Sequence, residues 1–194
     1  MRKPEADKIA RKIGCLIFAG LLALAGCDSQ RESSSYAVAE SENDKKFDNR
    51  KEENEADFVV DAIQDRYAEI KLAELISTKS SDKNIQDFAQ ELVNDQSKIL
   101  TQLQQFAADR RITVPVDEGN AAKEKVNKLF EQDDADFDKK WRRELSSNHK
   151  KSIRKYERML ERTDDAALKT VIGQALISLR TSLTKLDDFG NKEL

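Results

Sequence analysis

The sequence predicts an all-α protein, an antiparallel four-helix bundle preceded by a disordered N-terminal tether. Three observations support this fold class. The 194 residues are 37% charged and 6% aromatic, with six Gly and two Pro, a composition that suits long solvated helices better than sheets. Beyond about residue 55, apolar residues recur at spacings of three and four, the period of an amphipathic helix. Four such stretches are long, and they bury their apolar sides best against one another.

The first two long helices are separated by a polar interruption. They cover about residues 55–78 and 82–110, and the sequence TKSSDKN lies between their apolar stripes. The second helix is expected to end before Pro115 and Gly119, because neither residue continues a helix readily. A short helix is predicted at about residues 121–130.

The other two long helices follow in the C-terminal half. The third covers about residues 134–162, with apolar residues again spaced by three and four. Thr163 can cap the fourth, whose apolar stripe extends from Leu168 to Leu186. Residues 55–190 are therefore predicted to form one folded domain.

Residues 1–26 are predicted to be a lipoprotein signal peptide. Residues 1–12 are basic, and the apolar run that follows is too short to span a membrane comfortably as a mature helix. The run ends in LAGC at residues 24–27, which resembles the bacterial lipobox. This resemblance implies that Cys27 is lipidated and becomes the new N-terminus after cleavage. An uncleaved N-terminal anchor is the alternative.

Lipidation at Cys27 places the protein in the bacterial cell envelope, anchored to a membrane and facing the periplasm. An aspartate after the lipidated cysteine resembles the inner-membrane retention signal of enteric-type bacteria, so Asp28 favours the inner membrane over the outer one. Residues 27–54 are rich in Ser, Glu, Asp and Lys, with only isolated apolar residues. We expect them to form a flexible lipidated tether that holds the domain about 30 Å from the bilayer.

Each long helix carries one polar residue on its apolar stripe, at spacings of three, four or seven from apolar neighbours. These residues are Glu69, Gln96, His149 and Ser182. His149 is the only histidine in the chain. Burying such groups without partners costs about 1–3 kcal/mol each. We therefore expect the four side chains to meet one another or trapped water inside the bundle.

Four segments carry a resemblance to a known family: AEIKLAEL (68–75), IQDFAQELVNDQ (85–96), FDKKWRRELSSNH (137–149) and LKTVIGQALISLRTSL (168–183). The region from about residue 58 to 189 resembles exported, ferritin-like four-helix proteins that are known mainly as a domain of unknown function and are often labelled "predicted outer membrane protein". In that family, histidines usually stand at the positions of Gln96, His149 and Ser182, and a glutamate often stands at Glu69. The resemblance implies a ferritin-like bundle and a link to envelope stress.

The residues present argue against a metal centre of the kind that the resemblance suggests. Ferritin-like di-iron centres use two Glu-x-x-His pairs, whereas this chain has one histidine and no such pair. We expect no cofactor and no metal, and a satisfied polar layer formed by the four residues. A divalent metal site, or general acid–base catalysis by His149 with Glu69, is the alternative left open. No nucleophile or glycine-rich motif indicates an enzyme.

The third helix is basic on its outward positions. The cations are Lys139, Lys140, Arg142, Arg143, Lys150, Lys151, Arg154 and Lys155. Such runs are usually solvated faces. The alternative is a patch that binds anionic lipid head groups or an acidic protein partner.

These observations together predict a non-catalytic envelope or stress-associated binding module. Two rival functions remain. One is a metal-binding or oxidoreductase-like bundle with a reduced ligand set, and the other is a scaffold that docks a partner or anionic lipid through its basic third helix. The net charge of −3 gives no reason to expect nucleic acid as a partner.

Overall fold

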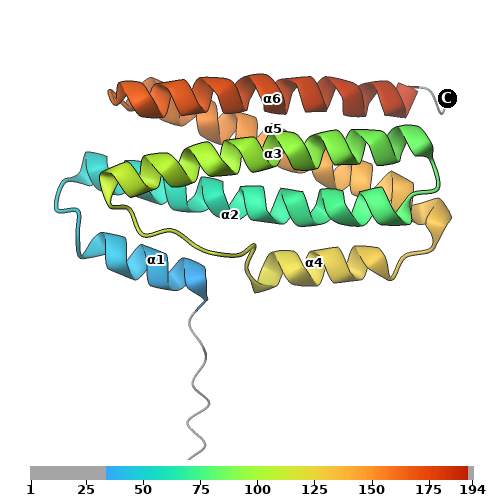
Figure 1. The fold of residues 1–194 in the computed structure, drawn as a ribbon, viewed down its shortest axis with the longest axis horizontal. Helices are drawn as coiled ribbons and strands as arrows, with labels where there is room; N and C mark the ends of the chain where they lie inside the picture. The colour runs from blue at the N-terminus through green and yellow to red at the C-terminus, as the bar shows by residue number, and fades with distance from the viewer. Residues whose placement is uncertain (1–33, 192–194) are drawn as a thin grey trace, which may run out of the picture. The chain divides into compact units, whose positions relative to one another are not determined.

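The computed structural model describes residues 34–191, which form six α-helices and no β-strand (Figure 1). The helices are α1 (Ser35–Asp44), α2 (Arg50–Lys79), α3 (Lys83–Arg110), α4 (Asn120–Phe130), α5 (Asp134–Arg162) and α6 (Ala166–Asn191). The predicted signal peptide, Cys27 and Asp28 lie outside the described residues. None of the described helices is both long enough and apolar enough to cross a membrane.

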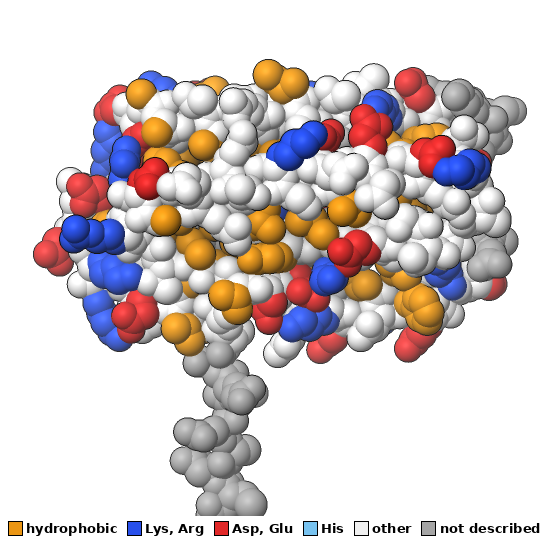
Figure 2. Space-filling view, viewed as in Figure 1, with side chains coloured by type: hydrophobic (Ala, Val, Ile, Leu, Met, Phe, Trp, Pro, Cys, Tyr) orange, Lys and Arg blue, Asp and Glu red, His pale blue; other side chains and the backbone are white. Residues whose placement is uncertain are grey.

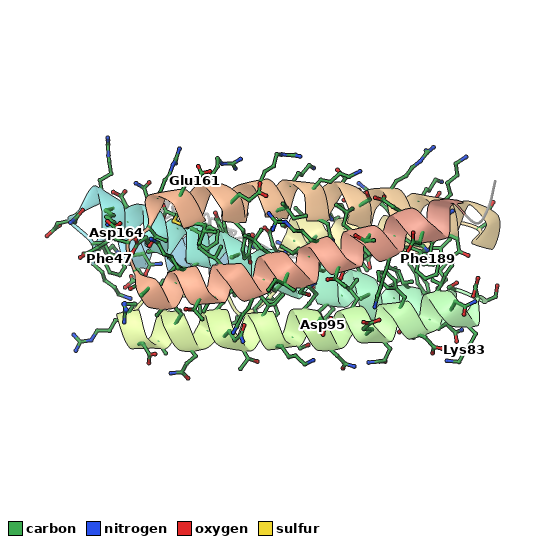
Figure 3. All side chains as sticks on the ribbon, turned by 90° about the horizontal axis from the view of Figure 1, so that it is seen from above. Phe47, Lys83, Asp95, Glu161, Asp164 and Phe189 are labelled. Atoms are coloured by element: carbon green, nitrogen blue, oxygen red, sulfur yellow. The ribbon has the colours of Figure 1, made fainter. Side chains whose placement is uncertain are left out.

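The four long helices α2, α3, α5 and α6 form a helical bundle. Helix α2 packs against α3 and α5, and α6 packs against α3 and α5, so each long helix contacts two others. Figure 3 shows that Lys83, at the start of α3, lies at the same end as Phe189, near the end of α6. These two helices therefore run in opposite directions. The shorter α1 and α4 pack on α2, and α4 also contacts α5.

The helix ends follow from local sequence chemistry. Asn49 and Asp82 cap α2 and α3, because each side chain accepts a hydrogen bond from the backbone N–H two residues later. Arg111 ends α3 in the left-handed conformation, with φ of 57°. Asp165 caps α6 by accepting from the N–H groups of the second and third residues that follow it. Thr163, the predicted cap, instead accepts a hydrogen bond from the N–H of Asp165.

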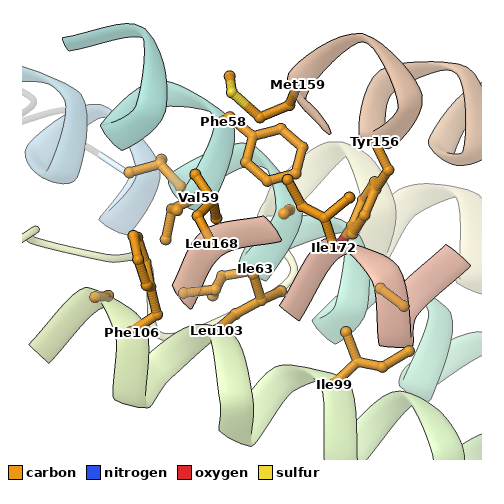
Figure 4. Packing of buried hydrophobic residues seen from close by; sticks show 14 of the residues in the cluster. Phe58, Val59, Ile63, Ile99, Leu103, Phe106, Tyr156, Met159, Leu168 and Ile172 are labelled. Atoms are coloured by element: carbon orange, nitrogen blue, oxygen red, sulfur yellow. The ribbon is translucent and has the colours of Figure 1, made fainter. Parts of the chain in front are cut away.

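The hydrophobic core consists of two clusters at different heights along the bundle. The first includes Phe58, Ile63, Leu103 and Ile172 and is shown in Figure 4. The second contains Trp141, which is fully buried and stacks on Phe88 with ring centroids 6.4 Å apart. Both clusters draw residues from all four long helices.

Polar side chains separate the two clusters. On each long helix, buried polar residues stand between the last residue of one cluster and the first of the other. On α2, for example, Arg66 and Glu69 lie between Ile63 and Leu72. We call this set the polar layer; its members are Arg66, Glu69, Gln96, His149, Ser152 and Ser182.

The structure differs from the predicted tether over residues 34–54. Residues 35–44 form α1, and the first residues of α2 extend the next helix beyond its predicted start. Helix α1 packs on α2: Ala39 is fully buried, and the Tyr36 hydroxyl donates to the Asp61 carboxylate at 2.6 Å. The isolated apolar residues of this segment are too sparse to form a stripe, but the first hydrophobic cluster includes Ala39 and packs against Tyr36 and Phe47.

Candidate functional site

All four polar residues selected from the apolar stripes are buried. Gln96 and His149 are fully withdrawn from solvent, while Glu69 and Ser182 retain 3% and 6% exposure. The structure brings Glu69, Gln96 and His149 together in one polar group around Arg66. Within the described residues, no hydrogen bond joins Ser182 to that group, so the structure brings together three of the four side chains that were expected to meet.

Arg66 holds the layer together, and sequence reasoning missed it. Its guanidinium is fully buried, and Nη1 donates to Glu69 Oε2 at 2.8 Å and to Gln96 Oε1. Its Nη2 donates to the hydroxyl of Ser152 at 3.2 Å. Burial lowers the pKa of Arg66, but the neighbouring Glu69 carboxylate outweighs this effect and the net shift is upward. The result is a buried, charge-compensated pair.

The signal for Arg66 was present in the sequence. It stands seven residues from Val59 and seven from Ala73, both fully buried, so it lies on the same apolar stripe of α2. Ser152 has a similar position, three residues after His149. A long cationic side chain on a surface helix is usually solvated, so the spacing alone did not indicate that Arg66 is buried.

The surroundings of His149 favour the neutral form of its imidazole ring. Its Nδ1 lies 3.1 Å from the Leu145 carbonyl and 3.6 Å from Glu69 Oε1. Burial lowers its pKa, and the charge of Arg66 lowers it further, whereas Glu69 and the Leu145 carbonyl act in the opposite direction. A neutral ring that donates from Nδ1 to the carbonyl leaves Nε2 as an acceptor. Nε2 is buried and has no protein partner within the described residues.

Tyr156 covers the layer on the side of the first hydrophobic cluster. The guanidinium carbon of Arg66 lies 5.9 Å from the centroid of its ring, within the range of a cation–π contact. Burial raises the pKa of Tyr156 to about 12. The hydroxyl therefore stays protonated at neutral pH and is no ready base.

A groove opens above the polar layer, between α2, α4 and α5. Its volume is about 1110 Å³, slightly above the roughly 300–1,000 Å³ typical of ligand sites. The lining includes Ala68, Glu69 and Leu72 of α2, Val126 and Leu129 of α4, and Ser152 of α5. Two members of the polar layer, Glu69 and Ser152, thus form part of the floor. We call this feature the α4 groove.

The basic residues predicted on the third helix are distributed over α5 in two environments. Lys139, Arg143, Lys150, Lys151 and Arg154 are exposed. Lys155 instead forms ion pairs with Asp61 at 3.3 Å and Asp65 at 2.7 Å, and Arg142 donates to backbone carbonyls of Asp138 and Phe189. Lys140 is exposed and donates to Gln132.

A second hollow, of about 470 Å³, lies on the basic face of α5. It is lined by Lys139, Arg142, Arg143, Ser146, Ser147, Lys150 and Leu186, with no acidic residue in the lining. Elsewhere the charges are more evenly mixed: on the face seen in Figure 2, Lys and Arg side chains are interspersed with Asp and Glu.

No described set of three or more His, Cys, Asp or Glu side chains is arranged to hold a metal ion. Within the polar layer, the guanidinium of Arg66 already stands 2.8 Å from the carboxylate that a metal would need. Asp95 is partly occupied by an ion pair with Lys98 at 3.3 Å, and Asp138 accepts a hydrogen bond from the Trp141 indole. Each of these two carboxylates thus already has a partner of its own.

Residues 40–189 match a family model described as "Domain of unknown function (DUF4142)". The chain belongs to the DUF4142 family. The DUF4142 region includes α2 to α5 entirely, and it starts within α1 and ends within α6. This membership agrees with the expected helical family of unknown function.

One solved structure gives a likeness of fold to this DUF4142 protein. It is the crystal structure of a DUF305 fragment from Deinococcus radiodurans, with a TM-score of 0.62, 15% sequence identity, and coverage of 72% of this chain and 96% of that one. At this identity the likeness concerns the fold alone. A search of curated proteins finds no match.

Proposed function

We propose that this DUF4142 protein is a lipid-anchored protein of the bacterial envelope whose helical domain is a non-catalytic binding module, with the α4 groove as its ligand site. The observation that carries the proposal is the groove itself. It is large, it is framed by three helices, and its floor reaches the buried polar layer. A concave, mainly apolar site with a few polar groups is the usual form of a small-ligand site.

The proposed fold is an antiparallel four-helix bundle of the ferritin-like kind. The contacts of α2, α3, α5 and α6, each with two of the others, support this assignment. The polar layer then serves as an internal feature that fixes the register of the four helices, a role with precedent in helical bundles. The proposed link to envelope stress rests on the family resemblance.

The start of α1 changes the expected reach of the membrane anchor. If Cys27 carries the lipid, only residues 28–34 separate it from α1, and a segment of that length spans at most about 25 Å when fully extended. Ser34 also lines the α4 groove. The proposal therefore puts the groove close to the periplasmic surface of a membrane, with the inner membrane favoured by Asp28.

The anchor is tested by metabolic labelling with an alkyne-bearing palmitate in the native host. We expect the wild-type chain to carry the label and to fractionate with membranes, and the Cys27→Ser variant to lose both properties. Label retained by Cys27→Ser would contradict lipidation at this residue. Separation of inner and outer membranes on a density gradient then tests the inference from Asp28.

The binding function is tested by filling the groove. Ala122 lines the α4 groove, and a tryptophan at this position occupies space that a ligand would need. Native mass spectrometry of the full chain extracted from its own membrane should find a bound small molecule in the wild type and not in Ala122→Trp. Ala167→Trp, at an exposed position of α6, is the control for added bulk. Equal occupancy in all three proteins would overturn the proposal.

The rival metal-binding or oxidoreductase-like function fits the polar layer less well. Glu69 and His149 approach each other, but the charge of Arg66 lies against the same carboxylate and opposes a second cation. Metal analysis of the protein isolated from its own membrane tests this alternative. Stoichiometric metal that is lost in His149→Ala would favour the rival over the binding module.

The second rival is a scaffold that docks through the basic face of α5. The hollow of about 470 Å³ supports it, because every charged residue in the lining is a lysine or an arginine. Binding of the full chain in neutral nanodiscs to vesicles with and without anionic lipid, at low and raised salt, tests it. Salt-sensitive binding that is lost in Lys139→Gln/Lys150→Gln would support a docking surface. A solvated face gives no such binding.

A further inference from the structure

Helix α4 has an apolar side that the rest of the protein covers only partly. Ala122, Val126 and Leu129 follow one another at spacings of four and three, and all three line the α4 groove. None of the residues of α4 is fully buried. Val126 and Leu129 touch the second hydrophobic cluster from the groove side. An apolar ligand in the groove would remove this surface from water, which favours binding.

The rim of the groove carries an excess of positive charge. Lys128 of α4 and Arg143 and Lys151 of α5 line the groove, are exposed, and form no ion pair within the described part of the chain. Of the other cations of the lining, Lys125 pairs with Glu144 at 3.4 Å, Lys155 pairs with Asp65, and Lys140 donates to Gln132.

The acidic residues of the lining leave most of this excess in place. Asp65 and Glu144 are the partners of the neutralised cations, and Glu69 is paired with Arg66 on the floor. Glu118 alone among the acidic lining residues has no ion pair within the described residues. Three free cations against one free carboxylate favour an anionic ligand group at the rim.

The floor has the opposite preference. Oε1 of Glu69 is buried, lacks a hydrogen-bond partner among the described protein groups, and belongs to a side chain that lines the groove. A carboxylate or a phosphate next to it would bring a second acceptor with no proton to share, so this oxygen favours a donor. An anionic ligand group is therefore confined to the rim, and the part of the ligand that lies between α2 and α4 must be uncharged.

We propose that the α4 groove binds a fatty acid, with its alkyl chain along Ala68, Leu72, Val126 and Leu129 and its carboxylate on Arg143 and Lys151. This inference rests on the proposed binding function and specifies its ligand class. The apolar side of α4 and the basic rim explain the two ends of an amphiphile, and the short segment between Cys27 and α1 keeps the groove near a source of acyl chains.

The test uses photo-crosslinking with three probes of one alkyl length. The full chain is reconstituted in nanodiscs of neutral lipid, and a diazirine fatty acid is compared with the corresponding alcohol and amine. We expect the carboxylate probe to label peptides from α2 and α4, with at least about tenfold weaker labelling by the amine. Labelling outside the groove, or equal labelling by acid and amine, would overturn the proposal.

Two adjacent lysines supply the matched variants. Lys150 and Lys151 are both exposed and both without an ion pair in the described chain, but Lys151 lines the α4 groove and Lys150 does not. Lys151→Gln should weaken fatty acid binding about threefold, as expected for one rim charge, and Lys151→Gln/Arg143→Gln about tenfold. Lys150→Gln should have no effect. An equal loss in Lys150→Gln would show that the surface charge of α5 as a whole, and not the rim, recruits the probe, and would overturn the assignment.

The outcome also separates this inference from the proposed function. If the membrane-extracted protein holds a small molecule that Ala122→Trp excludes, but that molecule is cationic or polar throughout, the binding module stands and the fatty acid proposal fails. If no molecule is found and no probe labels the groove, both fail.

Discussion

Arg66 and Glu69 form a buried ion pair on one turn of α2, with 2.8 Å between Nη1 and Oε2 and almost no exposure of either side chain. Because the guanidinium also donates to Gln96 and Ser152, the pair connects three of the long helices. This arrangement explains how a bundle with two hydrophobic clusters tolerates charges between them. Each charge is compensated by its neighbour, and removing one alone leaves the other buried and unpaired.

Glu69→Gln is therefore expected to be strongly destabilising. The variant leaves the buried Arg66 charge uncompensated, which lowers the free energy of unfolding by about 3–5 kcal/mol. The double variant Arg66→Met/Glu69→Gln should recover a large part of this loss, because no charge remains in the interior. Urea unfolding at pH 7, followed by circular dichroism, measures all three proteins.

A second pair on the same helix provides the control. Lys71 and Glu74 have the same sequence spacing and the same 2.8 Å distance, but both side chains are about half exposed. Glu74→Gln should cost no more than about 1 kcal/mol. If Glu69→Gln and Glu74→Gln lower the free energy of unfolding by similar amounts, burial does not make the Arg66–Glu69 pair more important for stability than an exposed pair.

The lowered pKa of His149 predicts a pH dependence of stability. In the unfolded chain His149 takes up a proton near its ordinary pKa of about 6.5, whereas the folded protein resists this because burial and Arg66 lower the pKa. The unfolded state thus binds more protons below about pH 6.5, so the His149 contribution is fully present above that pH and falls as the pH drops, by up to about 1.4 kcal/mol per unit.

Unfolding of the wild type and His149→Gln between pH 7 and pH 5 measures this contribution. The glutamine does not titrate, so its free energy of unfolding should fall less steeply over that range. Groups facing the imidazole, namely Glu69 and Arg66, are unchanged in the variant. Parallel curves for the two proteins would show that His149 is protonated equally in the folded and unfolded states.

The long helices and their buried polar residues were predictable because both follow from the spacing of apolar residues along the sequence. Spacings of three, four and seven identified Glu69, Gln96, His149 and Ser182, and all four are buried. The same spacings also place Arg66 on the buried stripe of α2, but a long cationic side chain is usually solvated, so its burial was not predicted. The partners within the layer were not predictable, because side-chain reach and helix rotation decide that Arg66, and not Ser182, meets Gln96.

Helix α1 and the α4 groove could not be predicted from local patterns in the sequence. The segment that forms α1 has few apolar residues, and its helix depends on the surface of α2, which no local pattern reports. The short helix at residues 120–130 was predicted to within a residue. The groove beside it was not, because it exists only where α2, α4 and α5 meet.

Asn43 is expected to hold α1 on the body of the protein. It is 2% exposed, its Nδ2 donates to the carbonyl of Thr113, and its Oδ1 accepts from the N–H of Thr113, both at 2.8 Å. Asn43→Ala removes both bonds and should weaken the docking of α1 by about 1–3 kcal/mol. Hydrogen exchange of residues 35–44 measures the effect, and unchanged protection there would contradict the role of Asn43.

Gly119 is expected to set the position of α4. Its φ of 76° and ψ of 160° belong to a region that is open essentially to glycine alone, and a Cβ there would stand 2.6 Å from Nε2 of Gln64. The Gln64 amide can rotate away, but the backbone conformation cannot be relieved, so Gly119→Ala should weaken the docking of α4 by about 1–3 kcal/mol. Hydrogen exchange of residues 120–130 should rise while the bundle stays folded, because no residue of α4 is fully buried.

Gly173→Ala is the matched control: nothing lies within 4 Å of the added Cβ, and alanine within α6 should stabilise the protein by about 0.5–1 kcal/mol. Unaltered exchange of α4 in Gly119→Ala would mean that the helix is held by contacts other than this turn, and a groove that depends on α4 should then bind its ligand equally well in both variants.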